Sequence, residues 1–459
     1  MKQICIDFSK KLQDWDGFGV NYVEACQTRD YKKNPQDYGG FSLLSKEKRE
    51  GILDMIFGVN GLKPGIVKMF LDPFHQVSPE SEYDHTTTTK WMRYFVKEGL
   101  SRTKAWGGDL KIITTLYGPP GWMTKQKFVR GRDLDPKHKY DCARYIISWV
   151  KYLKKIEKFP VKYISLHNEG EDWQRWPLDG STAGEERHDY NMYWPPEQVV
   201  DFLRFMREML DKENMQDVAL TPGETTNWYR FSEWGYAHLI ADDSEAIKNI
   251  GLITSHGFYN PNIGPFFGDW RSVGIDIIRA KRQDLHAWVT SMSWSGMDVY
   301  FINDIRNHIY SAKVNGIIPW AVVQMPSRWV GGDPNPGTAF HIDEKGDFYV
   351  KRGYYFYKQV CCAGQPGMAV VRVMSNDSEV ALIGFGNNNT DNPDAFVVLN
   401  LSTAKKDLNI EVSGSNSRLF NAYRSSDTER YILVGNFTVQ KGIISYTAPP
   451  KSVTTFYAS

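Results

Sequence analysis

Two short stretches decide the fold of this chain, Tyr163-Ile164-Ser165-Leu166-His167-Asn168-Glu169 and Trp288-Val289-Thr290-Ser291-Met292. Each is an apolar run that ends in polar side chains. A strand that is buried on both faces gives such a run, and a parallel barrel presents functional side chains at the carboxyl ends of its strands. The two stretches therefore predict two strands of one parallel sheet, with polar residues at the same edge.

Similar apolar runs lie on both sides of these stretches and alternate with amphipathic segments. Two of those segments predict helices: residues 140–156, and a segment that opens at Pro195-Pro196-Glu197 and carries apolar residues at helical spacing. Eight strands alternating with helices predict a (β/α)8 barrel over residues 15–350, with a doubly wound sheet as the alternative. The candidate strands are residues 17–23, 66–71, 111–117, 163–168, 218–222, 252–256, 286–291 and 317–323.

The pattern changes near residue 353, where helical periodicity is no longer visible. Strand-like runs separated by Gly, Asn, Asp and Ser clusters predict an all-β sandwich over residues 351–459. The alternating residues 1–14 have no role inside a barrel, so we expect them to add a strand to that sandwich. The runs are residues 368–374, 379–385, 395–401, 430–434 and 453–457.

The composition excludes several classes of partner. The net charge is +1 without a long run of either sign, whereas a nucleic-acid or membrane-surface site needs a basic patch. No segment approaches the roughly 20 apolar residues of a membrane span. The chain has 15 Trp and 25 Tyr, whose rings suit stacking on sugars. We therefore expect a carbohydrate partner and neither a metal nor an organic cofactor, while the oligomeric state stays open.

The cysteines and the N-terminus bear on the compartment. The five cysteines are odd in number and lack metal-ligand spacing, which is typical of buried thiols in a reducing environment. Residues 1–8 alternate like a strand and lack the apolar segment of a signal peptide. The sequence predicts a cytoplasmic protein, although a secreted chain that has lost its signal would have the same features.

Glu169 and Ser291 close the fourth and seventh candidate strands. Hydrolysis of a glycosidic bond with retention needs two carboxyl groups about 5–5.5 Å apart, one to protonate the leaving oxygen and one to attack the anomeric carbon. Glu169 has the position of the acid, and the amide of Asn168 beside it suits a sugar hydroxyl. Ser291 stands where the second carboxylate is required.

The chain resembles glycoside hydrolase family 30, whose retaining enzymes have (β/α)8 barrels. The most specific motif is Tyr117-Gly118-Pro119-Pro120-Gly121-Trp122-Met123, which is similar to that family's segment after the third strand. Asn168-Glu169 resembles its acid/base motif, and His256-Gly257-Phe258-Tyr259 resembles its sixth-strand motif. Shorter matches at residues 17–19, 41–53 and 354–367 follow in the same order, so the resemblance spans nearly the whole chain.

Three positions depart from the family pattern. Gly170 follows Glu169 where the family usually has Pro, and Lys68 stands where a second-strand Arg is usual. Ser291 replaces the nucleophilic glutamate, and a serine hydroxyl without an adjacent base cannot form the glycosyl-enzyme in its place.

Three accounts of Ser291 remain open. One is a deliberate glutamate-to-serine change made to trap a substrate or to build a glycosynthase. Another is a natural pseudoenzyme that binds carbohydrate without catalysis. In the third account the motif is misplaced, and the second carboxylate is Asp298, Glu171 or, best placed at the end of the fifth strand, Glu224.

The family resemblance and the strand ends also suggest which residues contact a substrate. We expect Trp320 to form the floor under the reacting sugar, Trp294 to form a wall, and the third-strand loop to contribute Tyr117 and Trp122. His256 and Tyr259 are expected to hold the nucleophile position. Glu24 and Glu224 are candidates for sugar hydroxyls, although Glu24 suits a capping role equally well. The long loop 171–195 contributes Trp173 and further aromatic and arginine residues.

Together these features predict a retaining β-glycoside hydrolase acting on a β-linked oligosaccharide, polysaccharide or glycoside by double displacement. Glu169 would be the acid/base, and Ser291 occupies the nucleophile position, so hydrolysis by this chain is expected to be slow. The alternative is a non-catalytic carbohydrate-binding protein on the same fold.

Overall fold

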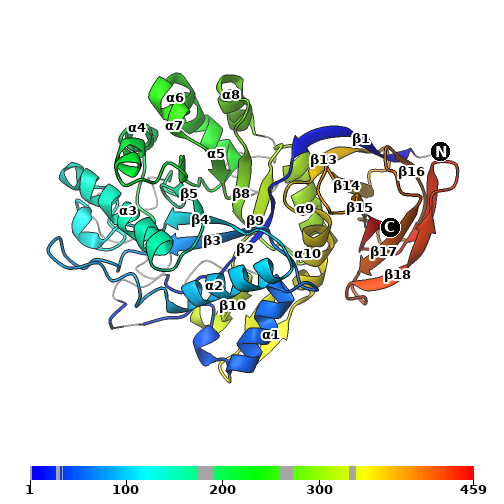
Figure 1. Cartoon of the computed structure of the whole chain (residues 1–459), viewed down its shortest axis with the longest axis horizontal. Helices are drawn as coiled ribbons and strands as arrows, with labels where there is room; N and C mark the ends of the chain where they lie inside the picture. Colours follow the sequence, from blue (N-terminus) through cyan, green and yellow to red (C-terminus); the bar gives the residue numbers. More distant parts are fainter. Residues whose placement is uncertain (1–2, 27–30, 34, 173–189, 259–271, 330–336) are drawn as a thin grey trace.

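The computed structural model describes residues 3–26, 31–33, 35–172, 190–258, 272–329 and 337–459. A barrel of strands surrounded by helices lies beside a separate β-sheet domain (Figure 1). In the described part of the chain, no helix is both long and apolar enough to cross a membrane.

The barrel consists of eight parallel strands in the order β6-β5-β4-β3-β2-β9-β8-β7. Parallel bridges from Leu220 to Ile250 and from Thr225 to Ser255 join β6 to β7, so the two ends of this sheet meet. The (β/α)8 barrel is therefore confirmed, and the doubly wound alternative is wrong because its sheet would stay open. The strands are β2 (Gly17–Asn21), β3 (Ile66–Leu71), β4 (Lys111–Leu116), β5 (Val161–Ser165), β6 (Ala219–Thr221), β7 (Ile253–Ser255), β8 (Ala287–Met292) and β9 (Gly316–Pro319).

Helices connect successive strands and cover the outside of the barrel (Figure 1). The two helices predicted from the sequence are confirmed as α3 and α4, and α4 buries Val199, Leu203, Met206 and Leu210 on one face. The helices are α1 (Lys46–Phe57), α2 (Lys90–Ala105), α3 (Lys139–Lys155), α4 (Pro196–Lys212), α5 (Trp228–Glu233), α6 (Tyr236–Asp242), α7 (Ser244–Asn249), α8 (Val273–Lys281) and α9 (Val299–Tyr310).

The barrel interior changes from apolar to polar along the strands. One buried cluster combines Ile66, Ile113, Trp288 and Ile318 from four strands with Leu252, which directly precedes β7. Because successive residues of a strand point to opposite faces, the residues two positions further along point to the same side. Those residues are Lys68, Thr115, Thr254, Thr290 and Trp320. The apolar layer thus supports a polar layer at the carboxyl ends of the strands.

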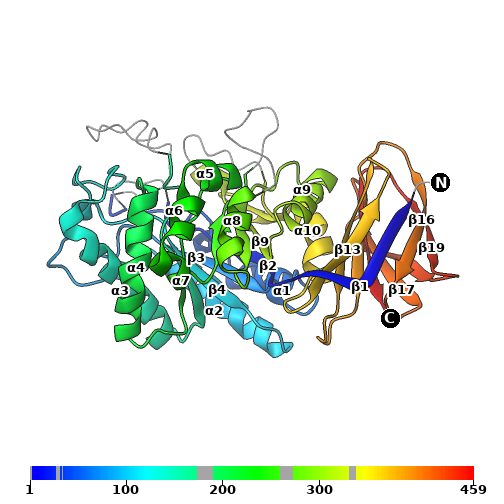
Figure 2. The same cartoon turned by 90° about the horizontal axis from the view of Figure 1, so that it is seen from above.

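The second domain is built on a nine-stranded sheet in the order β18-β17-β20-β15-β14-β13-β1-β16-β19. Its two end strands, β18 and β19, are joined only by residues 439–442, so the sheet must curl until its ends meet and enclose a second core. β1 lies between β13 and β16, as Figure 2 shows in blue. The strands are β1 (Ile4–Asp14), β13 (Ala369–Ser375), β14 (Val380–Gly386), β15 (Ala395–Asn400), β16 (Lys406–Ser413), β17 (Leu419–Ser425), β18 (Ile432–Thr438), β19 (Ile443–Ala448) and β20 (Ser452–Ala458).

Two expectations about this part of the chain need correction. Helical structure does not end near residue 353, because α10 (Arg352–Ala363) follows. This helix buries Tyr354, Phe356, Tyr357, Val360 and Cys361. Because apolar residues occupy most of its circumference, its sequence lacks the one-sided apolar pattern that identifies a surface helix. The expected runs also omitted β16, β17 and β19 and the small sheet of β10 (Val323–Gln324), β11 (Phe340–Ile342) and β12 (Phe348–Val350).

Candidate active site

Glu169 lies just beyond the carboxyl end of β5 in a left-handed backbone conformation with φ of 44°. Its N–H donates to the carbonyl oxygen of Glu224 at 2.6 Å, and this bond joins the segment after β5 to the segment after β6. The Glu169 side chain is 13 % exposed, and its Oε1 accepts from Nδ1 of His256 at 2.8 Å. It is therefore a carboxylate at the barrel mouth that the hydrogen bond from His256 helps to orient and that solvent still reaches.

Gly170 explains the first departure from the family pattern. Its N–H donates to Nδ1 of His167 at 3.1 Å, a bond that a proline could not make. A Cβ at this position would also lie 2.9 Å from the carbonyl oxygen of Met192. Burial lowers the pKa of His167 to about 3, so the ring is neutral and its Nδ1 can accept that bond.

Ser291 lies in β8, where pairing with β9 becomes irregular between Val289 and Met292. Lys68 Nζ donates to the Thr290 carbonyl oxygen at 3.3 Å and to Ser291 Oγ at 3.2 Å. Ser291 is 1 % exposed and Lys68 is fully buried. Position 291 is thus occupied by a short hydroxyl held against a buried ammonium group.

Glu224 is the centre of the site and is fully buried. Its Oε1 accepts from Thr115 Oγ1 at 2.5 Å, and its Oε2 accepts from Nε2 of His256 at 3.0 Å and from Lys68 Nζ. Burial alone would raise the pKa of this carboxyl, but the charge of Lys68 and the bond from His256 outweigh it and lower the pKa to about 2. Both oxygens of Glu224 are therefore committed to protein groups.

His256 bridges the two carboxylates. Burial lowers its pKa, but the hydrogen bonds to Glu169 and Glu224 outweigh burial, and the net shift is upward. In the protonated form both ring nitrogens donate. That His256 holds the nucleophile position stays a prediction: in this chain its ring contacts Glu169 and Glu224, and the group that contacts Ser291 is Lys68.

The charges of the site balance. With His256 protonated, two carboxylates face two cations, and the four groups sum to zero with serine at position 291. Like charges that are buried together raise each other's energy steeply, so a further carboxylate here would need its own compensation.

The other candidate carboxylates have structural contacts. Oε1 of Glu171 accepts from the Thr226 N–H at 2.9 Å and from Arg230 at 3.1 Å. Asp298 is the N-cap of α9 and accepts from the Tyr300 N–H at 2.9 Å. Together with the commitments of Glu224, these contacts favour position 291 as the place from which a nucleophile would act.

The aromatic candidates lie deeper than expected. The wall position of Trp294 is corrected, because this side chain is fully buried, donates to the Trp320 carbonyl oxygen and stacks on Phe301. Tyr117 is also fully buried, with its ring between those of Phe70 and Tyr190. The substrate contact expected of Tyr117 is therefore corrected to a packing role.

The remaining candidates are distributed around the barrel mouth. Trp320 is 6 % exposed at the end of β9, and half-buried Trp122 donates to the Gln76 carbonyl oxygen at 3.2 Å. The amide of Asn168 donates to Asn191 at 3.0 Å, and its Oδ1 has no partner among the described residues. Trp173 and Tyr259 lie outside the described residues.

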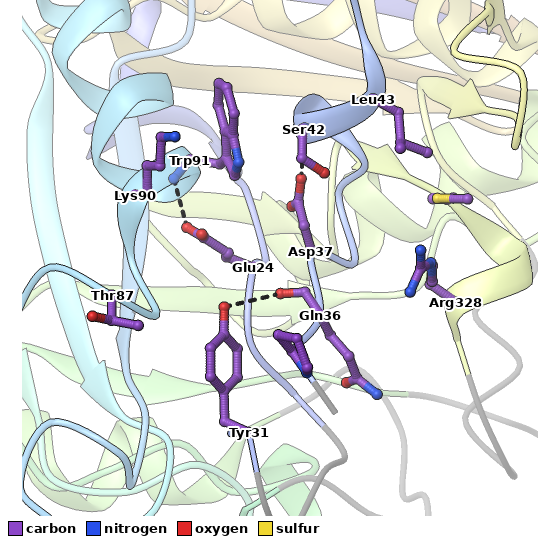
Figure 3. Close-up of a pocket in the computed structure, with 12 residues that line it drawn as sticks. Glu24, Tyr31, Gln36, Asp37, Ser42, Leu43, Thr87, Lys90, Trp91 and Arg328 are labelled. Carbon is purple, nitrogen blue, oxygen red and sulfur yellow. Dashed lines mark hydrogen bonds between the residues drawn. The ribbon is translucent and has the colours of Figure 1, made fainter. Parts of the chain in front are cut away.

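Glu24 has the capping role. Its Oε2 accepts from the N–H of Trp91 at 2.7 Å, a bond that Figure 3 shows, and from the N–H of Met92 at 2.9 Å, both at the beginning of α2. Within the described ranges, no three His, Cys, Asp or Glu side chains are grouped so that they could hold a metal ion.

The Lys68–Glu224 pair is the feature that the sequence analysis missed. Its signal was present, because Lys68 is a charged residue inside the apolar run Ile66-Val67-Lys68-Met69-Phe70-Leu71. A lysine in a buried strand requires a buried partner. The partner's identity depends on the barrel closing, which brings residue 224 to residue 68.

Gly223 sets the position of Glu224, and we predict that Gly223→Ala destabilises the protein by about 2–4 kcal/mol. The backbone has φ of 105°, and a Cβ would lie 2.1 Å from the His167 ring, which Gly170 holds in place. Gly51→Ala is the matched control, because a Cβ within α1 would meet nothing within 4 Å. That variant should gain about 0.5–1 kcal/mol. Equal urea stability of both variants would contradict the prediction.

Comparison with known proteins supports the fold. No protein-family model matches the sequence, and no curated protein is significantly similar to it. A glycoside hydrolase family 30 subfamily 8 xylanase from Clostridium acetobutylicum has a TM-score of 0.72 at 18 % identity, with 100 % of this chain and 99 % of that chain covered. A family 30 endoxylanase from Clostridium papyrosolvens C71 gives 0.71 at 15 %, with 100 % of both chains covered. An endo-β1,6-glucanase gives 0.69 at 17 %, with 100 % and 94 % covered. The resemblance to family 30 is therefore confirmed at the level of the fold.

Proposed function

We propose that this protein is a glycoside hydrolase for a β-linked saccharide, built for a retaining mechanism. Glu169 protonates the leaving oxygen and later takes a proton from water, while a glutamate at position 291 would attack the anomeric carbon. Serine lacks that carboxylate, so the chain cleaves slowly and keeps its ability to bind the sugar.

One observation carries this proposal. Glu169 and Ser291, from opposite parts of the barrel sheet, reach the same hydrogen-bonded cluster, in which His256, Glu224 and Lys68 connect them in series. Glu169 is the member of this cluster that solvent reaches, as a general acid requires. Ser291 is buried, and its position is the one from which attack would come. The similar xylanases and the β1,6-glucanase have the same fold.

The test is chemical rescue of the unchanged chain with azide or formate on aryl β-glycosides of xylose and glucose and of their β-linked oligosaccharides. A small anion can occupy the space that a glutamate side chain would fill, form the bond to the anomeric carbon and expel the aryloxide. We expect release of the aryl group to rise at least about tenfold with either anion. Glu169→Gln controls for general acid catalysis with a poor leaving group. Absence of rescue on every glycoside would overturn the hydrolase proposal.

The charge balance favours a second candidate, a carbohydrate-binding protein without catalysis. With serine at position 291 the buried charges are already paired, as in a site adapted to the absence of a nucleophile. This candidate predicts that oligosaccharides bind and that no anion accelerates cleavage.

A further inference from the structure

A hollow beside the Glu169 site lies at the same end of the barrel as that residue. This outer pocket has a volume of about 250 Å³, and its lining includes Glu24, Gln36, Asp37, Lys90, Trp91 and Arg328. Glu24 follows β2, Lys90 and Trp91 begin α2, and Arg328 ends a 3-10 helix (Pro326–Arg328) beyond β9 and β10. Carboxyl ends of barrel strands and amino ends of the helices that follow them share one face, which is also the face of Glu169.

The strand order places the outer pocket relative to the reacting groups. β2 is paired with β3, which carries Lys68, and with β9, whose other neighbour β8 carries Ser291. Glu169 follows β5, three strands from β2 in the sheet. The general acid stands beside the leaving group. The outer pocket is therefore on the side of the sugar that the leaving group does not occupy.

The carboxyl groups of the outer pocket are fixed in place. Glu24 accepts from two N–H groups of α2, and Asp37 accepts from the Tyr22 hydroxyl at 2.6 Å and the Ser42 N–H at 2.8 Å. Burial raises the pKa of both, and Asp37 raises that of Glu24 further. Acceptors that are already oriented lose little entropy when a ligand binds.

The lining has the chemistry of a site for a neutral polyol. The lining combines two acids, Glu24 and Asp37, with two cations, Lys90 and Arg328, so it does not present charge of a single sign to a ligand. Figure 3 shows the rings of Trp91 and Tyr31 on opposite sides of Glu24. Aromatic rings mixed with hydrogen-bonding groups suit the apolar faces and the hydroxyls of a pyranose.

Gln36 provides an independent sign of a ligand. Its side chain lines the outer pocket, the residue is 8 % exposed, and its Oε1 has no hydrogen-bond partner in the part of the chain that is described. A buried acceptor without a partner costs free energy that a ligand hydroxyl would recover.

We propose that the outer pocket binds a neutral pyranose unit of the glycone, so that the substrate is an oligosaccharide or polysaccharide rather than a small monosaccharide glycoside. The inference rests on the proposed function of the Glu169 site. A chain that fills both places must continue from the reacting sugar, on the side away from Glu169, to Glu24 and Arg328.

The experiment is calorimetric titration of the whole chain with two ladders of probes, β-1,4-xylo-oligosaccharides and β-1,6-gluco-oligosaccharides, each from monosaccharide to hexasaccharide. For one ladder, affinity should rise by about tenfold at the chain length that first reaches the outer pocket. Arg328→Ala and Gln36→Leu should remove this gain and leave the affinity for shorter members unchanged. Arg328 is exposed, so its removal should not disturb folding.

Arg144→Ala removes another exposed arginine, on α3 outside the pocket; this variant is the matched control and should leave every affinity unchanged. The proposed role of the outer pocket would be overturned if affinity did not depend on the length of the oligosaccharide, or if Arg328→Ala lowered affinity equally at all lengths. The proposed function would still stand. Failure of both ladders to bind would overturn the proposed function and this inference together.

Discussion

Ser291→Glu is expected to cleave an activated aryl β-glycoside at least about a thousandfold faster than the unchanged chain. Removal of a nucleophile that forms a covalent intermediate typically costs several orders of magnitude, so its restoration should recover a large share. Lys68 already lies 3.2 Å from the Ser291 hydroxyl and can hold the new carboxylate. A glutamate oxygen reaches two bonds further than this hydroxyl, roughly 2.5 Å. The measurement is steady-state kcat/KM.

Two variants control this prediction. Ser291→Gln has the same shape without the charge and should give no gain. Combining Ser291→Glu with Glu169→Gln should lose most of the gain on a glycoside with a poor leaving group, because protonation of the leaving oxygen is then missing. A Ser291→Glu protein that is folded, binds sugar and remains inactive would favour the non-catalytic candidate.

Lys68→Met is expected to lower the free energy of unfolding by about 3–5 kcal/mol, because it leaves the buried Glu224 carboxylate without its strongest partner. The loss should depend on pH. The pKa of Glu224 is depressed from 4.5 to about 2, so the stability it contributes is present above pH 4.5 and disappears as the pH falls toward 2. The difference between the two proteins in urea unfolding should therefore shrink over that range.

The double variant Lys68→Met with Glu224→Gln separates the ion pair from packing. It should be less destabilised than the sum of the single variants, since neither charge is then left alone. Lys154→Met is the matched surface control: its partner Asp217 is 57 % exposed, and the change should stay within about 1 kcal/mol. The Lys68–Glu224 pair would not be dominant if the double variant lost as much free energy of unfolding as the two single variants together. The same conclusion would follow if Lys68→Met lost no more than Lys154→Met.

The barrel was predictable because its strands carry a strong local signal. Runs such as residues 66–71 and 317–323 are almost wholly apolar, and the buried strands β3 and β9 correspond to them. The amphipathic strand β16 was missed although its burial alternates regularly, because two acids, an asparagine and a serine occupy its exposed face. α10 was missed for the opposite reason, since it is apolar on too many sides.

The candidate site was predictable only where a residue acts at the end of its own strand. Glu169 and Ser291 could be located in this way. The partners of His256 and Lys68 could not, because each pair forms between strands whose relative positions depend on the closed barrel. The burial of Trp294 could not be predicted either. The sequence places this residue after β8, but its packing against Phe301 and Tyr357 is what turns it toward the core.

The most direct test is the configuration of the glycosyl azide that the unchanged chain forms from a β-glycoside, determined by proton NMR. If Glu169 and position 291 flank the sugar from opposite sides, azide must attack from the side of Ser291 while the aryloxide leaves beside Glu169, and the product is the α-glycosyl azide. A β-glycosyl azide would mean attack from the side of Glu169, and it would contradict the assignment of the two positions.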